Sequence, residues 1–222
     1  MSTEEANLAR PGGQEAAAPA SRRVAAPADI GFVGLGQMGT AMAANLAGAG
    51  HLVIAYVRRP DHMDDLSARG LKPTTHIADL FDCAFVISMV PDDNAVREVV
   101  FGRQDRGING LVSGLKRGAI HLSMSTISTF AAFEVAEGHA AHGQGYVGAP
   151  VFGNPDAAKA RQLFIIAAGT PADVERCQPL FDVLGEKAFV VGTEPGHANL
   201  VKLLGNMMTA TWASQPCAIG SA

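Results

Sequence analysis

The sequence of 222 residues predicts an α/β fold, a doubly wound and mostly parallel Rossmann sheet followed by the start of a long helix. Three observations support this prediction. Short, continuous apolar runs alternate with helical stretches, which is typical of strands that are buried on both faces. A glycine-rich turn joins the first run to the first helix. Small residues, including 25 glycines, are abundant enough for helices to pack closely on a sheet.

The expected strands are short apolar runs separated by helical stretches. The runs lie at 30–33, 52–57, 84–90, 119–124, 146–151, 163–168 and 187–191. The helical stretches lie at 40–50, 61–69, 93–101, 129–142 and 171–184, and a long helix starts near Gly196. Residues 1–28 are rich in Ala and Pro and have few large side chains to bury, so we expect a disordered extension there.

Composition excludes several classes of partner. A net charge of −4 gives no reason to expect nucleic acid or an anionic membrane surface. No apolar run approaches the ~20 residues of a membrane span, and the N-terminus lacks the apolar core of a secretory signal. Three cysteines without CxxC spacing indicate incidental thiols in a reducing compartment, so a cytoplasmic location is expected.

No metal site is expected from the sequence. His139 and His142 stand at i and i+3 on an expected helix, a spacing that can hold a metal. No third ligand accompanies them in the sequence. We therefore expect ordinary surface histidines at both positions.

The motif GLGQMG directly follows the first strand and opens the first helix. Gly34 would allow a tight turn, Gly36 would let the backbone approach a pyrophosphate, and Gly39 would permit close packing of helix on strand. The pyrophosphate would rest on free N–H groups at the helix N-terminus. The alternative is a structural turn without a ligand. The motif predicts a dinucleotide site formed by Gly34, Leu35, Gly36, Gln37, Met38 and Gly39, within a Rossmann domain at 29–192.

The end of the second strand indicates which dinucleotide binds. A site that prefers NAD places an acidic residue there, for the ribose 2′-hydroxyl. This chain has Arg58 and Arg59 and no acid before Asp61. An arginine at this point would pair with a 2′-phosphate. NADP(H) is therefore the expected cofactor, with NAD(H) possible. The alternative is two solvated loop arginines.

Lys202 and Asn206 are spaced i, i+4, which places both side chains on one face of the last helix. A lysine beside a substrate and a nicotinamide can exchange the hydroxyl proton while hydride moves to or from the cofactor. Asn206 can fix the reacting oxygen, because its amide offers a donor and an acceptor. Ser125, on the loop after the 119–124 strand, would hold a substrate carboxylate. The alternative for Lys202 is an ordinary solvated lysine.

Four segments, in order, resemble the 3-hydroxyisobutyrate dehydrogenase family, a branch of the β-hydroxyacid dehydrogenases that includes 6-phosphogluconate dehydrogenase. They are GFVGLGQMGTAMAANLAGAGH from Gly31, MVP at 89–91, MSTIS at 124–128 and GHANLVKLLGN at 196–206. The resemblance implies that Met89, Val90, Pro91 and Thr126 contact the cofactor, and it implies the same roles for Ser125, Lys202 and Asn206. It also implies a homodimer.

The chain departs from the family pattern at 148–158, GAPVFGNPDAA. Phe152 stands where the family usually has a serine, and Asn154 stands where a second glycine is usual. Gly153 is retained, so Gly153 and Asn154 are expected to contact substrate. The bulk and apolar surface of Phe152 should change substrate preference and disfavour polar sugar acids.

The resemblance implies an NADP(H)-dependent oxidoreductase that interconverts a small β-hydroxy acid, or a similar alcohol, with its aldehyde or ketone. Residues 193–222 would form the start of an interdomain helix, with the family's all-helical second domain largely absent, so the polypeptide is expected to be incomplete. A non-catalytic NADP(H)-binding fragment or association module is the main alternative. Imine reductases share the scaffold but usually lack a lysine at position 202.

Overall fold

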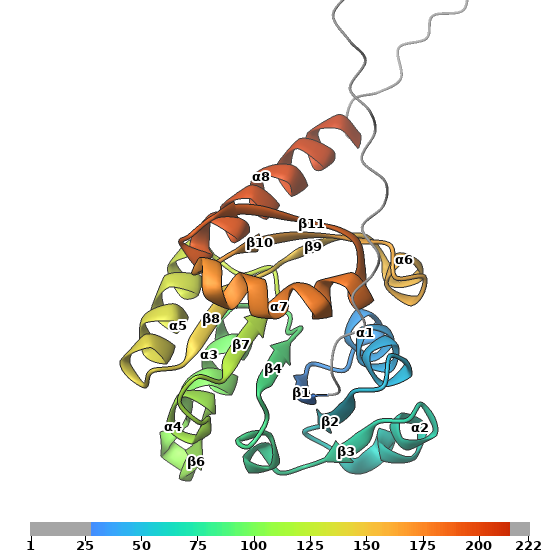
Figure 1. Ribbon diagram of the computed structural model, residues 1–222, viewed down its shortest axis with the longest axis vertical. Helices are drawn as coiled ribbons and strands as arrows, with labels where there is room; N and C mark the ends of the chain where they lie inside the picture. The colour runs from blue at the N-terminus through green and yellow to red at the C-terminus, as the bar shows by residue number, and fades with distance from the viewer. Residues whose placement is uncertain (1–27, 214–222) are drawn as a thin grey trace, which may run out of the picture.

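The computed structural model describes residues 28–213. The expected extension at 1–28 therefore lies outside the described residues, apart from Ala28. The described chain forms an α/β sandwich in which helices cover both faces of one large sheet (Figure 1). The doubly wound, mostly parallel sheet and the long final helix predicted from the sequence are both confirmed.

The large sheet has nine strands in the described part of the chain, in the order β11-β10-β8-β7-β4-β1-β2-β3, with β9 paired to β10. The strand bounds are β1 Asp29–Val33, β2 Leu52–Tyr56, β3 Lys72–Thr74, β4 Phe85–Ser88, β7 Ile120–Ser123, β8 Gly145–Gly148, β9 Val151–Phe152, β10 Leu163–Ala168 and β11 Gly185–Gly192. A separate small hairpin joins β5 Gly102–Arg103 to β6 Ile108–Asn109.

Eight α-helices connect these strands within residues 28–213. They are α1 Gln37–Gly48, α2 Met63–Ala68, α3 Asp93–Phe101, α4 Leu111–Gly114, α5 Thr129–Ala141, α6 Pro155–Lys159, α7 Pro171–Leu184 and α8 Pro195–Ala213. Short 3-10 turns occur at Pro60–His62, Ile77–Leu80 and Gln104–Arg106. None of the described helices is long and apolar enough to cross a membrane.

The largest apolar core lies between the sheet and the helices α1 and α7. Phe32, Met42, Leu46 and Phe181 are among its members, and all four are buried. A second cluster on α3 and α5, which includes Val96 and Val135, packs beneath the other face. Burial on both faces explains why the central strands are continuous apolar runs in the sequence.

The order of the strands reverses at β1. β2 and β3 are added on one side of β1, and β4 and β7 are added on its other side, with β2 and β4 both parallel to β1. This is the topological switch point of the sheet, where open α/β folds place their ligands at the carboxyl ends of the strands. The glycine turn at 34–39, the segment 89–91 and the loop 124–128 follow β1, β4 and β7, so they all lie at this edge.

Two features of the fold differ from the sequence prediction. β10 runs antiparallel to β8, and β10 and β11 are parallel to each other. Apolar runs carry no information about strand direction, so this reversal was not predicted. The short elements β3, β5, β6, β9, α4 and α6 were also not predicted, because two to five residues are too few to show a period.

Helix α8 leaves the sheet at its N-terminal end and extends beyond the other elements (Figure 1). It packs on α5 and on the strands β8, β10 and β11. Its remaining surface carries several exposed apolar side chains. They are Leu200, Val201, Leu203, Leu204, Met207 and Met208.

Candidate dinucleotide site

The glycine turn after β1 requires glycine at two positions for steric reasons. Gly34 has φ +93°, and a Cβ there would lie 2.2 Å from the carbonyl oxygen of Met89. A Cβ on Gly39 would lie 1.9 Å from the carbonyl oxygen of Gly34. Any side chain at either position would therefore push the turn away from β4 or the helix away from the turn.

Gly36 is different, because a Cβ there would meet no atom of the chain within 4 Å. The residue is exposed and forms the N-cap of α1, which has no side-chain cap. Free N–H groups at a helix N-terminus attract an anion such as a pyrophosphate. The space beside Gly36 is open because the residue has no side chain, and a dinucleotide needs this space to approach the backbone. The turn therefore fits this ligand.

The neighbouring side chains leave this backbone surface free. Leu35 and Met38 are half-buried and pack against the main core cluster, so they anchor the turn to the fold. Gln37 is exposed at the start of α1. The predicted roles of the three glycines thus have a geometric basis, with Gly34 and Gly39 needed for the fold and Gly36 available to a ligand.

Arg58 and Arg59 follow β2 at the same edge of the sheet, because Val33 pairs with Tyr56 in the parallel register of β1 and β2. Both arginines are exposed. Neither forms an ion pair with any residue between 28 and 213. Two unpaired cations beside an anion-binding turn suit a second phosphate.

The segment Met89–Pro91 connects β4 to the site. The Met89 N–H donates to the carbonyl oxygen of Val33, with 2.8 Å between N and O, so β4 and the glycine turn are tied together. The Val90 N–H donates to Oγ of Ser125 over 2.8 Å. Pro91 is exposed. The segment is thus held in place between the glycine turn and the loop 124–128.

Ser125 is fully buried, which the sequence did not predict. Its hydroxyl accepts from the Val90 N–H and lies 3.4 Å from the carbonyl oxygen of Ser88, to which it donates. In this arrangement the hydroxyl is occupied by the backbone of the β4 end. Thr126, the next residue, is half-buried and lies closer to solvent.

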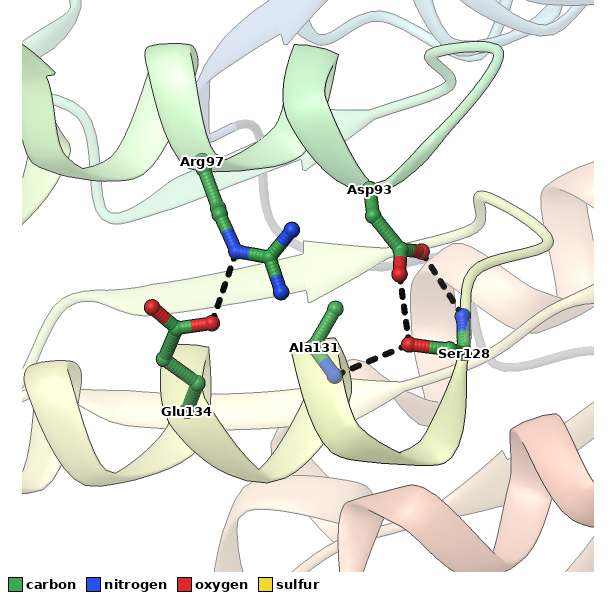
Figure 2. Close-up of polar contacts among 5 residues, drawn as sticks. All are labelled: Asp93, Arg97, Ser128, Ala131 and Glu134. Atoms are coloured by element: carbon green, nitrogen blue, oxygen red, sulfur yellow. Dashed lines mark hydrogen bonds and ion pairs between the residues drawn. The ribbon is translucent and has the colours of Figure 1, made fainter.

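The loop 124–128 is also anchored to α3, as Figure 2 shows. The Asp93 carboxylate accepts from the Ser128 N–H over 2.8 Å and from the Ser128 hydroxyl over 2.5 Å. The same hydroxyl accepts from the Ala131 N–H and so caps α5. Partial burial acts to raise the pKa of Asp93, but the hydrogen bonds from Ser128 and the nearby Arg97 outweigh it and lower that pKa.

A second contact between α3 and α5 reinforces this anchor. Nε of Arg97 lies 2.7 Å from a carboxylate oxygen of Glu134, so a second pair joins the two helices further along them than Asp93 and Ser128 (Figure 2). The pair is partly exposed, and its own contribution to stability is small. Its effect is to keep the two helix starts in register around the loop.

Asn199 anchors the loop from the opposite side and was missed by the sequence analysis. It is fully buried on α8, and its Oδ1 accepts from the Ile127 N–H over 3.2 Å. Its Nδ2 is buried and makes no hydrogen bond to any described residue. The available signal was its i, i+3 spacing to Lys202, which places it on nearly the same side of the helix.

Lys202 lies on α8 one turn beyond Asn199 and is buried, with 9% of its surface exposed. Burial lowers the pKa of its ammonium group. No carboxylate in the described chain is paired with it. Asn206, one turn further, is exposed. The helix therefore places Lys202 near the loop and leaves Asn206 facing solvent.

The 148–158 segment forms the wall beside Lys202. The ring of Phe152 faces the ammonium, with 3.9 Å between Nζ and the ring centroid. Gly153 is exposed, with φ +145°. Asn154 is the N-cap of α6, where its Oδ1 accepts from the Ala157 N–H over 2.8 Å. Part of its side chain is thus used to start a helix.

A buried chain of side chains lies below the β4 end. The ring nitrogens of His121 lie 2.9 Å from Oγ of Ser88 and 2.9 Å from Nε2 of His139. Nδ1 of His139 lies 2.7 Å from Oε1 of Gln144. The expectation that His139 is a surface residue was wrong, because its ring is fully buried between α5 and the sheet. His142 is exposed, as expected.

Among residues 28–213, no group of three His, Cys, Asp or Glu side chains is placed to hold a metal ion. The polar groups at the carboxyl edge of the sheet are the free helix N-terminus at Gly36 and the exposed Arg58 and Arg59.

A glycine turn with one open side, at the switch point of a parallel sheet, defines the class of dinucleotide-binding Rossmann domains. Comparison with known families supports this and is more specific. Residues 29–192 match the NAD binding domain of 6-phosphogluconate dehydrogenase. The chain belongs to this family.

Its curated relatives include two named oxidoreductases. The chain is 38% identical over 181 residues to the uncharacterized oxidoreductase YfjR of Bacillus subtilis, and 34% identical over 181 residues to glyoxylate/succinic semialdehyde reductase 1 of Arabidopsis thaliana. Each match covers 81% of this chain and 61% of the relative. The chain thus spans about three fifths of the length of these relatives.

Solved structures show the same architecture. The 3-hydroxyisobutyrate dehydrogenase of Mycobacterium tuberculosis superposes with a TM-score of 0.76 at 28% identity, over 83% of this chain and 61% of that one. Psf3 in complex with NADP+ and 2-OPP superposes with a TM-score of 0.75 at 29% identity, over 81% of this chain and 62% of that one.

Proposed function

We propose that this chain provides the cofactor-binding part of an NADP(H)-dependent oxidoreductase that interconverts a small β-hydroxy acid, or a similar alcohol, with its aldehyde or ketone. The observation that carries the proposal is Lys202, a buried lysine without a carboxylate partner, one helical turn along α8 from Asn199, which binds the loop 124–128. The names of the relatives, among them a glyoxylate/succinic semialdehyde reductase, support a small carbonyl acid as substrate.

The cofactor part of the proposal assigns a task to each segment at the sheet edge. The backbone at 34–39 binds the pyrophosphate, and Arg58 with Arg59 pairs with the 2′-phosphate. Met89–Pro91 and Thr126 lie on the path toward the nicotinamide end, because they follow the next strands along the sheet. The bound nicotinamide supplies or accepts the hydride.

Lys202 is the proposed acid and base. In the reducing direction its ammonium donates a proton to the oxygen of the substrate carbonyl, and in the oxidising direction the neutral amine removes the hydroxyl proton. A lowered pKa favours this task, since it brings the neutral and charged forms of the amine closer in free energy at neutral pH. Asn206 is one turn beyond Lys202 and exposed, and we assign it to the same oxygen by turning its side chain toward a substrate bound at Lys202.

The rest of the chain keeps these groups in place. Asn199 and Asp93 hold the loop 124–128 from two sides, so the segment beside Lys202 does not depend on ligand for its conformation. Ser125 contributes through its bonds to the β4 end, and Gly153 and Asn154 offer backbone and amide groups on the substrate side.

The proposal is tested with the full-length protein, by following NADPH oxidation with a panel of short aldehyde acids. We expect turnover, and a loss of kcat of at least a hundredfold in Lys202→Met. Lys159→Met is the matched control, because Lys159 is an exposed lysine on α6, where it pairs with Asp156 of the same helix. Unchanged turnover in Lys202→Met would exclude the acid–base role.

A parallel titration separates catalysis from binding. If NADPH binds tightly and no aldehyde acid is turned over, the site is a dinucleotide-binding module and the catalytic part of the proposal fails. If NADPH does not bind, the cofactor part fails as well.

A further inference from the structure

The ammonium of Lys202 lies over the ring of Phe152. Nζ lies 3.9 Å from the ring centroid, which is well inside the range of a cation–π interaction. No ion pair or hydrogen bond to Lys202 is found among residues 28–213. The ring thus occupies the place where a buried lysine ordinarily has a carboxylate.

The ring is held rigidly in that place. On one side it packs against the small cluster of Ile166, Ala168 and Ala198. On the other side it fills a notch in α8, because a Cβ on Gly205 would lie 2.5 Å from Cζ of the ring. Gly205 and Lys202 are three residues apart on the same helix face. A glycine inside a helix is unfavourable, and here it makes room for the ring.

We propose that Phe152 is the positioning residue for Lys202 and that, through this contact, the site selects carbonyl substrates whose substituent beside the lysine is apolar. The proposal rests on the proposed function for its second half only. The positioning role concerns two side chains of this chain and can be measured without turnover.

The selection follows from distance and chemistry. A carbonyl oxygen that hydrogen-bonds to Nζ lies about 3 Å from it, so it lies within about 7 Å of the ring centroid. A substituent on the neighbouring carbon is then within reach of the ring, and the proposal places it there. A ring face has no strong donor or acceptor, so a hydroxyl group there loses its water without a replacement, whereas a methyl group loses nothing.

The positioning role is tested by competitive acetylation with acetic anhydride at a series of pH values, with each lysine quantified by mass spectrometry. In Phe152→Leu we expect Lys202 to react at least threefold faster at high pH, because its side chain is less confined. We also expect its midpoint of labelling to move to lower pH, because the charged form loses the ring face. Phe152→Tyr, which keeps the ring, should behave as the unchanged protein does.

Two references make this measurement specific. Lys159 is exposed and reports the general reactivity of lysines in each sample. Phe81→Leu removes a half-buried ring that packs beside Gly114 in a different apolar cluster, and it should leave Lys202 unchanged. An identical rate and midpoint for Lys202 in the unchanged protein and in Phe152→Leu would overturn the proposal.

The selection is tested by comparing kcat/KM for 3-oxopropanoates that carry either a 2-methyl or a 2-hydroxyl group. We expect the unchanged protein to favour the methyl compound at least tenfold, and Phe152→Ser to reduce this ratio at least fivefold. An unchanged ratio overturns the selection. A shift in labelling without turnover of either compound upholds the positioning role and rejects the proposed function. Turnover without any shift in labelling upholds the proposed function and rejects the positioning role.

Discussion

His121 and His139 are joined by a hydrogen bond between ring nitrogens, with 2.9 Å from Nδ1 of the first to Nε2 of the second, and both rings are fully buried. The direction of this bond follows from Gln144. Its Nε2 donates to the carbonyl oxygens of Val112 and Leu115, so its Oε1 must accept from Nδ1 of His139. Each bond in the chain then has one direction, from the Ser88 hydroxyl to Gln144, with both histidines neutral.

The histidine chain predicts acid sensitivity of the fold. Burial is the main cause that lowers both histidine pKa values, that of His139 from 6.5 to about 4. Between these values the unfolded chain binds more protons than the folded one, so stability falls as pH falls from about 6.5 to 4. For His139 alone this loss is about 3 kcal/mol, and His121 adds to it in the same direction. Above pH 6.5 the pair contributes no pH dependence.

Urea unfolding at pH 7.5, 6.5, 5.5 and 4.5 measures this slope. His139→Gln should be less stable at pH 7.5 and should show a flatter slope. His62→Gln removes an exposed histidine of the Pro60–His62 turn and should keep the slope of the unchanged protein. A free energy of unfolding that is the same at pH 7.5 and 4.5 contradicts the prediction.

The glycine turn predicts that two similar substitutions act on different properties. In Gly36→Ala the new methyl group meets no atom of the chain, so the free energy of unfolding should change by no more than about 1 kcal/mol. NADPH affinity, measured by fluorescence titration, should fall more than tenfold, because the methyl group occupies the approach of the pyrophosphate.

Gly39→Ala is the steric counterpart. Its methyl group would lie 1.9 Å from the Gly34 carbonyl oxygen, so we expect a loss of about 3 kcal/mol in stability by thermal or urea unfolding.

If Gly36→Ala binds NADPH as the unchanged protein does, the pyrophosphate does not lie over this turn.

Arg58 predicts the choice between the two dinucleotides. Charge-assisted hydrogen bonds to a phosphate contribute about 1.5–3 kcal/mol, so Arg58→Ala should reduce the ratio of NADPH to NADH affinity by at least tenfold. Arg69→Ala is a suitable control, since Arg69 is exposed at the end of α2, away from the sheet edge. Equal loss of affinity for both cofactors would show that Arg58 acts only on the shared part of the dinucleotide.

Asn199 and Asn206 predict opposite responses on one helix. Asn199→Ala leaves the Ile127 N–H buried without an acceptor, which should lower the free energy of unfolding by about 1–3 kcal/mol. Asn206→Ala changes an exposed side chain and should alter stability by less than about 0.5 kcal/mol. Urea unfolding of both variants tests this. Equal effects would mean that the Asn199 bond to the loop contributes nothing.

The parts of the fold that the sequence predicted are the ones set by local pattern. The glycine spacing at 34, 36 and 39 determines a turn from six consecutive residues, and each glycine has the geometry that its position required. The apolar runs placed the long strands for the same reason. Strand direction at β10 and β11 depends on how the chain returns to the sheet, which no local period encodes.

The parts of the candidate site that were missed join residues far apart in the chain. His121 and His139 meet because α5 folds back onto the sheet. The sequence prediction rested on the spacing of His139 to His142, which is typical of surface histidines, and it did not consider His121. Ser125 was predicted as a ligand group, yet its burial depends on the end of β4. Asn199 becomes a loop anchor only once α8 packs against residue 127.

The loop 124–128 is hydrogen-bonded to three parts of the fold, through Val90 after β4, Asp93 on α3 and Asn199 on α8. Its conformational entropy is therefore lost during folding and not when a dinucleotide arrives. Ordering the backbone of one flexible residue costs about 1–2 kcal/mol of conformational free energy, and a loop freed from its anchor would lose this when ligand binds. Removing the Asp93 or the Asn199 anchor would thus move an entropic penalty from the folding equilibrium to the binding equilibrium, so these two residues would affect affinity without a part in ligand contact.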